Sequence, residues 1–270
     1  MAAAATSLLG ILPSLLPSRT PSLLRRTGFS TNISRQSRRF FSIPEPSPVA
    51  VHAQAKRTFS LKEEEAATRD DLYFESPLKI VEYPDPKLRR KNKRIITFDD
   101  NLKKLADEMF DIMYKTDGIG LSAPQVGINV QLMVFNSAGE RGEGEEIVLV
   151  NPRLNKYSKK IVPFDEGCLS FPRIYADVKR PESVKIDARD VNGTRFSVSL
   201  SGLSARVFQH EYDHLEGILF VDRMTDEVLS SIHEQLQALE KKYEEKTGLP
   251  SPERVEVRKT RKAAAGFGKS

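Results

Sequence analysis

The sequence predicts a mixed protein of α-helices and β-strands, and three observations lead to that prediction. Apolar residues recur at helical spacing in three stretches, near residues 99–117, 203–216 and 225–247. Residues 184–200 alternate between apolar and polar around Asn192-Gly193, the pattern of a β-hairpin with a two-residue loop. Two short apolar runs, Val130–Phe135 and Ile147–Val150, are further strand candidates.

Residues 1–56 are expected to form an organelle transit peptide rather than a folded unit. The segment is rich in Ser, Pro and Arg, and residues 1–60 hold eight basic residues against the single acid Glu45. The remaining chain is therefore close to neutral, and the basic pI gives no support for a nucleic-acid-binding core. An ordinary disordered tail is the alternative. The Ala- and Ser-rich start favours the chloroplast stroma, whereas Arg38-Arg39-Phe40-Phe41-Ser42 would suit the mitochondrial matrix as an alternative or additional location.

The rest of the chain divides into three expected parts: an acidic, mobile linker at residues 57–75, a catalytic domain at 76–247 and a basic, disordered tail at 248–270. The domain is expected to open with a short strand at Leu78–Val81 and a turn around Pro84 and Pro86. No apolar run approaches the length needed to cross a bilayer, so no membrane partner is expected.

The first helix is expected to begin at Thr97 or Asp99 and to end at Gly118. Its apolar positions step by three and four residues: Leu102, Leu105, Met109, Ile112 and Met113. The next ten residues contain three glycines, which allow the backbone to approach a neighbour closely. We expect a loop here, because Pro124 opposes a following helix.

The stretch Gln209–Gly217 carries two histidines four residues apart with an acid between them. Leu203, Val207, His210 and His214 form one helical stripe, so the imidazoles lie on the same face and can share one metal ion. Glu211 is close enough to take a proton from a water on that metal. Gly217 is placed to end the helix. The alternative is a pair of core histidines satisfied by hydrogen bonds, but the chain has only four histidines and two adopt this spacing.

Cys168 is the best candidate for a third ligand. As the only cysteine it excludes a disulfide within the chain and fits a reducing compartment. A buried inert cysteine is the alternative, yet thiolate is a good ligand for the metals that two histidines bind. Three protein ligands leave a fourth position for water, whose pKa the metal lowers. Glu211 would accept the proton and deliver it to a departing amine, and the Leu169 N–H and the Gln125 amide are candidate donors to an oxyanion.

The last predicted helix runs from Thr225 to Thr247. One stripe holds Val228, Ile232, Leu236, Leu239 and Tyr243. Acidic residues open it, lysines close it, and Gly248 and Pro250 end it.

Three stretches together resemble the peptide deformylase family. They are Gly118-Ile119-Gly120-Leu121-Ser122-Ala123-Pro124-Gln125, Glu166-Gly167-Cys168-Leu169-Ser170 and Gln209-His210-Glu211-Tyr212-Asp213-His214. The resemblance covers about residues 76–245. One departure is Ser122, where the family usually has alanine.

The resemblance implies an α+β fold in which antiparallel or mixed sheets wrap a central helix carrying the two histidines, with a long C-terminal helix. It implies Cys168, His210 and His214 as metal ligands. Ferrous iron would be the working metal, with Zn²⁺, Ni²⁺ or Co²⁺ able to replace it. Glu211 would be the general base and acid, and Gln125 and Leu169 would be the oxyanion donors. Gly120 would pair with the substrate main chain. The other implied substrate-binding residues are Ile119 and Leu121 beside that chain, Glu166 and Gly167 near the methionine pocket, and Tyr175 at its mouth.

The implied reaction is hydrolysis of nascent N-formyl-methionyl polypeptides to formate and a free amino terminus. A different metallopeptidase with the same histidine motif is one alternative. Another is a non-catalytic, metal-stabilised module that docks on the organellar ribosome through the final helix and tail; the enzyme itself could also make that contact. The sequence leaves open whether the chain is a monomer or a homodimer.

Overall fold

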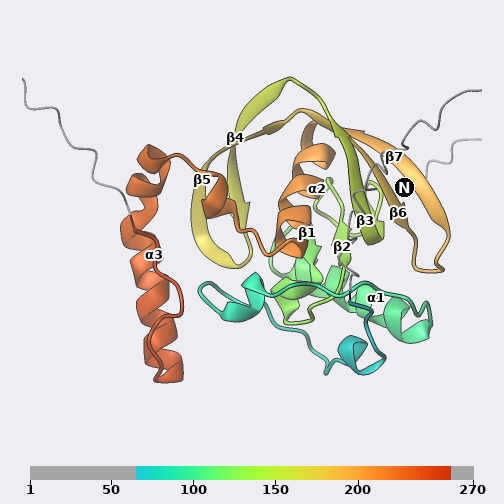
Figure 1. Ribbon diagram of the computed structural model, residues 1–270, viewed down its shortest axis with the longest axis horizontal. Helices are drawn as coiled ribbons and strands as arrows, with labels where there is room; N and C mark the ends of the chain where they lie inside the picture. Colours follow the sequence, from blue (N-terminus) through green and yellow to red (C-terminus); the bar gives the residue numbers. More distant parts are fainter. Residues whose placement is uncertain (1–64, 257–270) are drawn as a thin grey trace, which may run out of the picture. The chain divides into compact units, whose positions relative to one another are not determined.

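The computed structural model describes residues 65–256 (Figure 1). The transit peptide expected at 1–56 lies outside the described residues, as do 57–64 and 257–270. Among the helices of the described part, none is both long and apolar enough to span a membrane.

A five-stranded antiparallel sheet forms one side of the protein. Its strand order is β1-β2-β3-β6-β7. The strands are β1 (Gly120–Ser122), β2 (Leu132–Phe135), β3 (Ile147–Tyr157), β6 (Ser183–Arg189) and β7 (Arg195–Ser201). A second, two-stranded sheet pairs β4 (Ile161–Cys168) with β5 (Phe171–Pro181). The expected α+β class with antiparallel sheets is therefore confirmed.

The three predicted helices are present. They are α1 (Asp100–Lys115), α2 (Gly202–Leu215) and α3 (Asp226–Thr247), with short 3-10 turns η1 (Asp70–Leu72), η2 (Pro86–Arg89), η3 (Ala123–Val126) and η4 (Phe220–Arg223). The Asp99 carboxylate caps α1 by accepting the N–H groups of Asn101 and Leu102. Thr225 caps α3, which ends at Gly248 in the left-handed conformation. Gly217, with φ +71, follows the end of α2 as expected.

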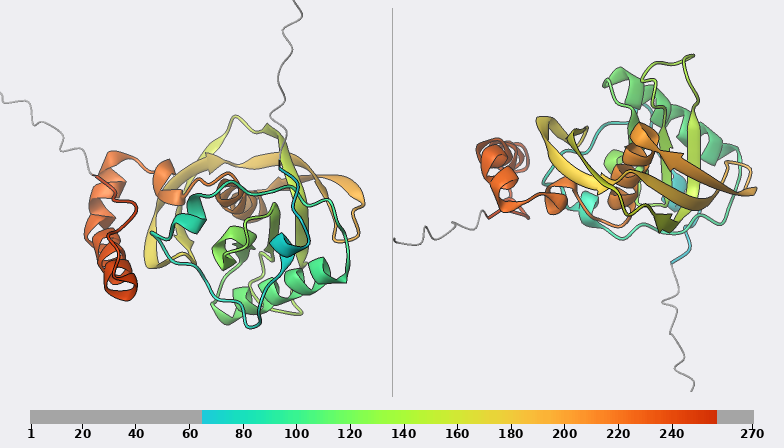
Figure 2. Two further views of the ribbon diagram at one scale, coloured as in Figure 1. Left: turned by 60° about the horizontal axis from the view of Figure 1, so that its bottom comes forward. Right: turned by 90° about the horizontal axis from the view of Figure 1, so that it is seen from above.

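Helix α2 lies between the large sheet and the β4–β5 hairpin (Figure 1). Inward-facing side chains of β6 pack with Val207 and Phe208 of α2 in one hydrophobic cluster. Leu203, although part of the predicted apolar stripe, is 39% exposed at the first turn. Helix α3 packs on the outer side of β5 (Figure 2), where Ile232 and Leu236 join a separate cluster with Phe171 and Val178.

Several elements differ from the sequence-based expectations. Leu78–Val81 forms no strand, because the Leu78 N–H donates to the Glu108 carboxylate and the Val81 N–H donates to the Gln125 carbonyl, and neither partner belongs to a strand. The expected loop after Gly118 contains β1 and η3, because Pro124 suits the first turn of a short helix. The 184–200 hairpin is confirmed, but its loop spans Val191–Gly193, where the Asp190 N–H donates to the Thr194 carbonyl and the Thr194 N–H donates to the Asp190 carboxylate. Three residues with Gly193 at φ +84 replace the expected two-residue turn.

The mobile linker expected at 57–75 does not extend to residues 66–75. Ala67 and Leu72 are buried in the core, Ala66 bridges to Arg94, and Lys93 forms an ion pair with Asp71.

The disorder expected from residue 248 onward does not extend to 248–256. This segment folds back on α3, where the Ser251 N–H donates to Glu244, the Val255 N–H donates to Glu240, and Glu253 pairs with Arg89.

Candidate metal centre

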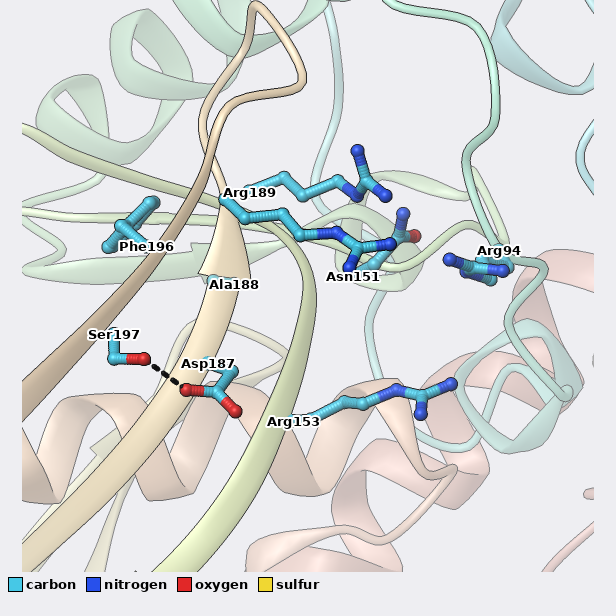
Figure 3. A pocket seen from close by; sticks show the side chains of 9 residues that line it. Arg94, Asn151, Arg153, Asp187, Ala188, Arg189, Phe196 and Ser197 are labelled. Carbon is cyan, nitrogen blue, oxygen red and sulfur yellow. Dashed lines mark hydrogen bonds between the residues drawn. The ribbon is translucent and has the colours of Figure 1, made fainter.

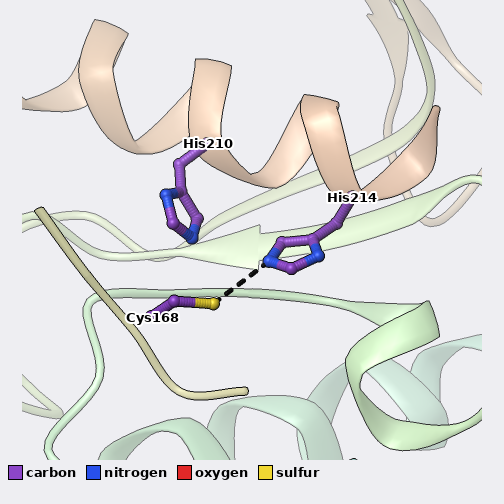
Figure 4. A group of neighbouring side chains, drawn as sticks. All are labelled: Cys168, His210 and His214. Carbon is purple, nitrogen blue, oxygen red and sulfur yellow. Dashed lines mark hydrogen bonds between the residues drawn. The ribbon is translucent and has the colours of Figure 1, made fainter. Parts of the chain in front are cut away.

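The ligand atoms of Cys168, His210 and His214 all lie within 4.8 Å of one another (Figure 4). Cys168 is the last residue of β4, and the two histidines project from one face of α2. The Cys168 sulfur is 3.3 Å from His214 Nε2. The structure thus brings together the three residues that the sequence pointed to.

The donor set fits a divalent metal ion. Metal–sulfur bonds near 2.3 Å and metal–nitrogen bonds near 2.0 Å in a tetrahedral site place sulfur and nitrogen about 3.5 Å apart. The observed sulfur–nitrogen distance of 3.3 Å is close to this value. Glu211 supports the same interpretation, because its Oε2 atom is buried beside the cluster without a hydrogen-bond partner within the described residues. Three ligands and an unpartnered carboxylate oxygen suit a site with one open coordination position.

Glu166 orients the His210 ring through the ring nitrogen that faces away from the cluster. Its Oε2 lies 3.1 Å from His210 Nδ1, which leaves Nε2 to face the cluster. Burial alone would raise the pKa of Glu166, but hydrogen bonds from His210 and Arg180 lower it to about 2. Arg180 donates to both Glu166 oxygens, at 2.8 and 3.1 Å, and Arg206 also pairs with Glu166. Arg180 continues to Asp213 at 2.6 Å. This buried network fixes the position of a candidate ligand.

The buried charges also tune the two histidines. Burial opposes a charge on His210, but the neighbouring Cys168 and Glu166 outweigh it and raise the His210 pKa to about 10. A cation that binds Nε2 must therefore displace a proton. Burial, together with the charges of His210 and Arg180, lowers the pKa of His214 well below its usual value. His214 is thereby held neutral, the form that binds metal.

Glu211 lies on α2 between the two histidines and is almost fully buried. Burial raises its pKa to about 7. A carboxylate with that pKa can exchange a proton near neutral pH, which is the property of a general base or acid.

Gln125 directs its amide nitrogen toward the cluster. Its Oε1 accepts hydrogen bonds from the backbone N–H and the hydroxyl of Ser122, each at 2.8 Å. Its Nε2 is consequently turned to the Cys168 sulfur, at 3.6 Å. The position is that of a donor to a substrate oxygen beside the metal, and Ser122 was not singled out by the sequence for this role.

Strand β1 lies at the edge of the large sheet and passes directly beside Glu211. A Cβ atom on Gly120 would lie 2.7 Å from Glu211 Oε1 and 2.5 Å from Val207 Cγ1, so only glycine fits there. Ile119 is half-buried near this edge. Leu121 was expected beside the substrate, but its side chain is fully buried in the core and is not exposed to a ligand.

The β4–β5 hairpin presents the remaining candidates. Tyr175 is 65% exposed, and its ring covers Gly167, where a Cβ atom would lie 2.6 Å from Tyr175 Cε1. Leu169 follows Cys168 in the connection between the strands. Glu166 was expected beside a methionine pocket, but its carboxylate is buried and engaged by His210 and two arginines.

Sequence reasoning missed Arg180, Arg206 and Asp213. One signal was available: along β5, Arg180 continues the alternation of the buried residues Ile174, Ala176 and Val178. An arginine in phase with a buried apolar row indicates a buried acidic partner.

Comparisons with known proteins point to one family. A family model described as polypeptide deformylase matches residues 77–229. The chain is 71% identical over 235 residues to the chloroplastic peptide deformylase 1B of Solanum lycopersicum, covering 86% of this chain and 84% of the relative. It is 73% identical over 224 residues to the chloroplastic/mitochondrial peptide deformylase 1B of Arabidopsis thaliana, covering 83% and 82%.

Solved structures of peptide deformylases also match this chain. A crystal structure of a plant peptide deformylase matches with 79% identity and a TM-score of 0.67, over 67% of this chain and 99% of that one. A peptide deformylase from Plasmodium falciparum matches with 44% identity and a TM-score of 0.61, over 63% of this chain and 99% of that one.

Proposed function

The chain belongs to the peptide deformylase family of enzymes, and we propose that it removes the N-formyl group from the N-terminal methionine of newly made organellar polypeptides. The observation that supports this most is the joint placement of Cys168, His210 and His214 around one point with the buried Glu211 carboxylate beside them. The reaction is hydrolysis of a formamide: water adds to the formyl carbon, the C–N bond breaks, and formate and a free amine leave.

A divalent ion held by these three residues would polarise the formyl carbonyl and acidify a water molecule. Glu211 accepts a proton from the attacking water and delivers it to the departing amine nitrogen. Gln125 Nε2 and the Leu169 N–H donate hydrogen bonds to the carbonyl oxygen as it gains negative charge. Glu166 keeps the His210 ring oriented throughout, because its own charge is fixed by Arg180 and Arg206.

The peptide is proposed to bind along the free edge of β1. The Asn136 N–H donates to the Ile119 carbonyl, so Ile119 faces β2. Because alternate residues of a strand turn their backbone groups to opposite edges, Gly120 faces away from β2. Its N–H and C=O are then placed to pair with an extended substrate, as an added strand would. Tyr175 and Gly167, which are paired across the β4–β5 hairpin, are proposed to border the bound peptide.

Fe²⁺ is proposed as the working metal, with Zn²⁺, Ni²⁺ or Co²⁺ able to occupy the site. The donor set of one thiolate and two imidazoles is compatible with each of these ions. Metal analysis of an anaerobic preparation, run beside a formate assay for each reconstituted ion, distinguishes them. Full activity with Zn²⁺ and none with Fe²⁺ would contradict the proposal.

A chloroplast location is proposed, with the mitochondrion as an alternative or additional site. Two relatives that this chain resembles at 71% and 73% identity are named chloroplastic, and chloroplastic/mitochondrial. The basic, serine-rich first 56 residues support the same location. Imaging the full chain fused to a fluorescent protein tests this, and a cytosolic signal would contradict it.

The reaction is tested with formyl-Met-Ala-Ser and with a peptide that offers only internal bonds. Formate release without internal cleavage is expected, whereas cleavage of the internal peptide would favour a metallopeptidase.

Glu211→Gln should retain its metal and lose formate release by several orders of magnitude. Unchanged turnover in that variant would remove Glu211 from the mechanism.

A further inference from the structure

The solvent-facing side of the large sheet carries a second concentration of charge. A cavity of about 720 Å³ lies beside β6, and its lining includes Arg94, Arg153, Arg189 and Arg195. Figure 3 shows Arg94, Arg153 and Arg189 extending into the space on one side of that strand. The only carboxylate in the lining is Asp187.

Three of the four arginines in this lining lack an acidic partner among the described residues. Within residues 65–256, no carboxylate forms an ion pair with Arg94, Arg189 or Arg195. Asp187 instead accepts a hydrogen bond from Ser197 (Figure 3). Arg189 is held in place, since it donates to the Gly193 carbonyl at 2.8 Å and lies 5.6 Å from the Phe98 ring centre. The guanidinium groups of Arg94, Arg189 and Arg195, gathered without acidic partners, favour an anionic ligand.

The charge continues beyond the cavity along the same face. Lys156 of β3 is paired in register with Lys185 of β6, and Arg189 of β6 with Arg195 of β7. Residues on one face of a strand recur about every 7 Å, so Lys185 and Arg189 flank Asp187 in one row. The serines Ser197 and Ser199 lie beside this row on β7 and add hydroxyl donors. We call these six residues the basic face: Arg94, Arg153, Lys156, Lys185, Arg189 and Arg195.

The basic face is separate from the metal centre. The alternate residues of β6, Val184, Ile186 and Ala188, point to the other side of the sheet and pack in the cluster that contains α2. A ligand on the basic face therefore leaves the metal centre and the edge of β1 accessible.

We propose that the basic face binds the phosphate backbone of RNA. An arginine-lined cavity with a lysine extension is unlike a small-molecule pocket, which is mostly apolar, and matches a long polyanion. Arginine forks pair with phosphate oxygens in two-point contacts, and serine hydroxyls add further donors to the backbone. The choice of RNA rests on the proposed function, because a newly made polypeptide is produced on an RNA-rich machine. The near-neutral total charge of the body conceals this one-sided arrangement.

The test compares two triple variants of the full, metal-loaded chain that lose the same charge. Lys156→Gln/Lys185→Gln/Arg195→Gln alters exposed positions of the basic face, and Lys241→Gln/Lys242→Gln/Lys246→Gln alters three exposed lysines of α3. Binding of a labelled oligouridylate is followed by fluorescence anisotropy over a range of salt concentrations. The basic-face variant should bind the RNA at least roughly tenfold more weakly. The slope of its log affinity against log salt concentration should become shallower by about 2 units, because three phosphate contacts are lost.

The α3 variant should bind like the unaltered chain. Equal weakening of RNA binding in the two variants would overturn the proposal, because binding would then follow total charge. An unchanged RNA affinity in the basic-face variant would also overturn it. Formate release is measured in the same preparations. If formate release is normal but the basic-face substitutions do not change RNA affinity, RNA binding is overturned and the proposed function stands. If formate release is absent but RNA affinity falls as predicted, the proposed function is overturned and RNA binding stands.

Discussion

Ser122 shows how one side chain can organise two proposed catalytic groups, Gln125 and Glu211. The residue is fully buried. Its N–H and O–H both donate to Gln125 Oε1, and its hydroxyl is also within hydrogen-bonding reach of Glu211. The contacts hold the Gln125 amide with its nitrogen toward Cys168, where a substrate oxygen would lie.

Ser122→Ala should lower kcat about five- to tenfold, since losing one hydrogen bond to an oriented group is worth about 1 kcal/mol. KM and metal content should not change, because Ser122 contacts neither the β1 edge groups nor a ligand. Gln125→Ala is the comparison and should lose roughly a hundredfold or more. Wild-type kcat in Ser122→Ala would show that the Ser122 N–H alone positions the amide.

Glu166→Gln should weaken metal binding at least about tenfold, because the partner of His210 loses its charge. It should also lower the free energy of unfolding by about 3 kcal/mol, since Arg180 and Arg206 remain buried beside a neutral amide. The pKa of Glu166 is depressed, so its stabilisation is present above about pH 4.5 and is lost as pH falls toward 2. The stability difference between the two proteins should therefore shrink in acid.

Urea unfolding at several pH values and metal analysis measure both effects. Asp165→Asn is the matched control, because Asp165 is the exposed neighbour of Glu166 on β4. Equal metal affinity in the Glu166 variant and the control would contradict the orienting role.

The pH dependence of formate release should report Glu211. Burial raises its pKa to about 7, and a bound cation would lower it again, so the protonated form should give way between about pH 4.5 and 7. The base is active only when ionised, so kcat/KM should rise with pH across this window. A profile measured on the metal-loaded enzyme that begins to rise only above pH 7 would contradict this assignment.

At the scale of elements, the three-residue strand β1 brings the proposed peptide-binding edge next to Glu211, the proposed general base and acid. Gly120→Ala would press a methyl group against Glu211 Oε1 and Val207. We expect kcat to fall at least about tenfold as Glu211 is displaced, with metal content retained because no ligand touches Gly120. Gly142→Ala, where nothing lies within 4 Å of an added Cβ, controls for the substitution itself. Equal activity in the two variants would show that Glu211 tolerates the shift.

Elements with a strong periodic pattern could be predicted from the sequence. The α3 stripe and the 184–200 hairpin were found, because each has one clearly apolar face. The β4–β5 hairpin was missed, since β4 exposes most of its side chains and its only buried residue is the charged Glu166. A strand whose single buried position is charged gives no alternating apolar signal.

The site could be predicted as far as sequence spacing carries information. Two histidines four apart must share a helix face, so their convergence follows from helix geometry. Cys168 and Gln125 reach the same point only through the fold; residue chemistry made them candidates, and the family resemblance supported the choice. Arg180 and Arg206 were missed because their partner, Glu166, lies 14 and 40 residues away in the chain.

At the scale of the whole molecule, the segment after α3 ties the helix to the rest of the protein. Arg89 of η2 pairs with Glu253 and with Asp222, and it donates to the Gly217 carbonyl that follows α2. Glu240 of α3 accepts from the Tyr83 hydroxyl at 3.2 Å and the Val255 N–H at 3.3 Å. Helix α3 in turn packs on β5, the partner of the strand that carries Cys168.

Ending the chain after Pro250 should therefore destabilise it, whereas ending it after Glu256 should not. The shorter protein loses the Glu253 ion pair, the Val255 contact and one hydrogen bond to the buried Glu240, which together are worth about 2 kcal/mol. Turnover of a small formyl peptide should survive in both, because none of residues 251–256, the described part of this segment, touches the candidate centre. Denaturant unfolding of the two truncated proteins measures the difference, and equal midpoints would mean that residues 251–256 contribute no stability. A large loss of turnover in the shorter protein would instead mean that α3 holds the β4–β5 hairpin, and with it Cys168, in its working position.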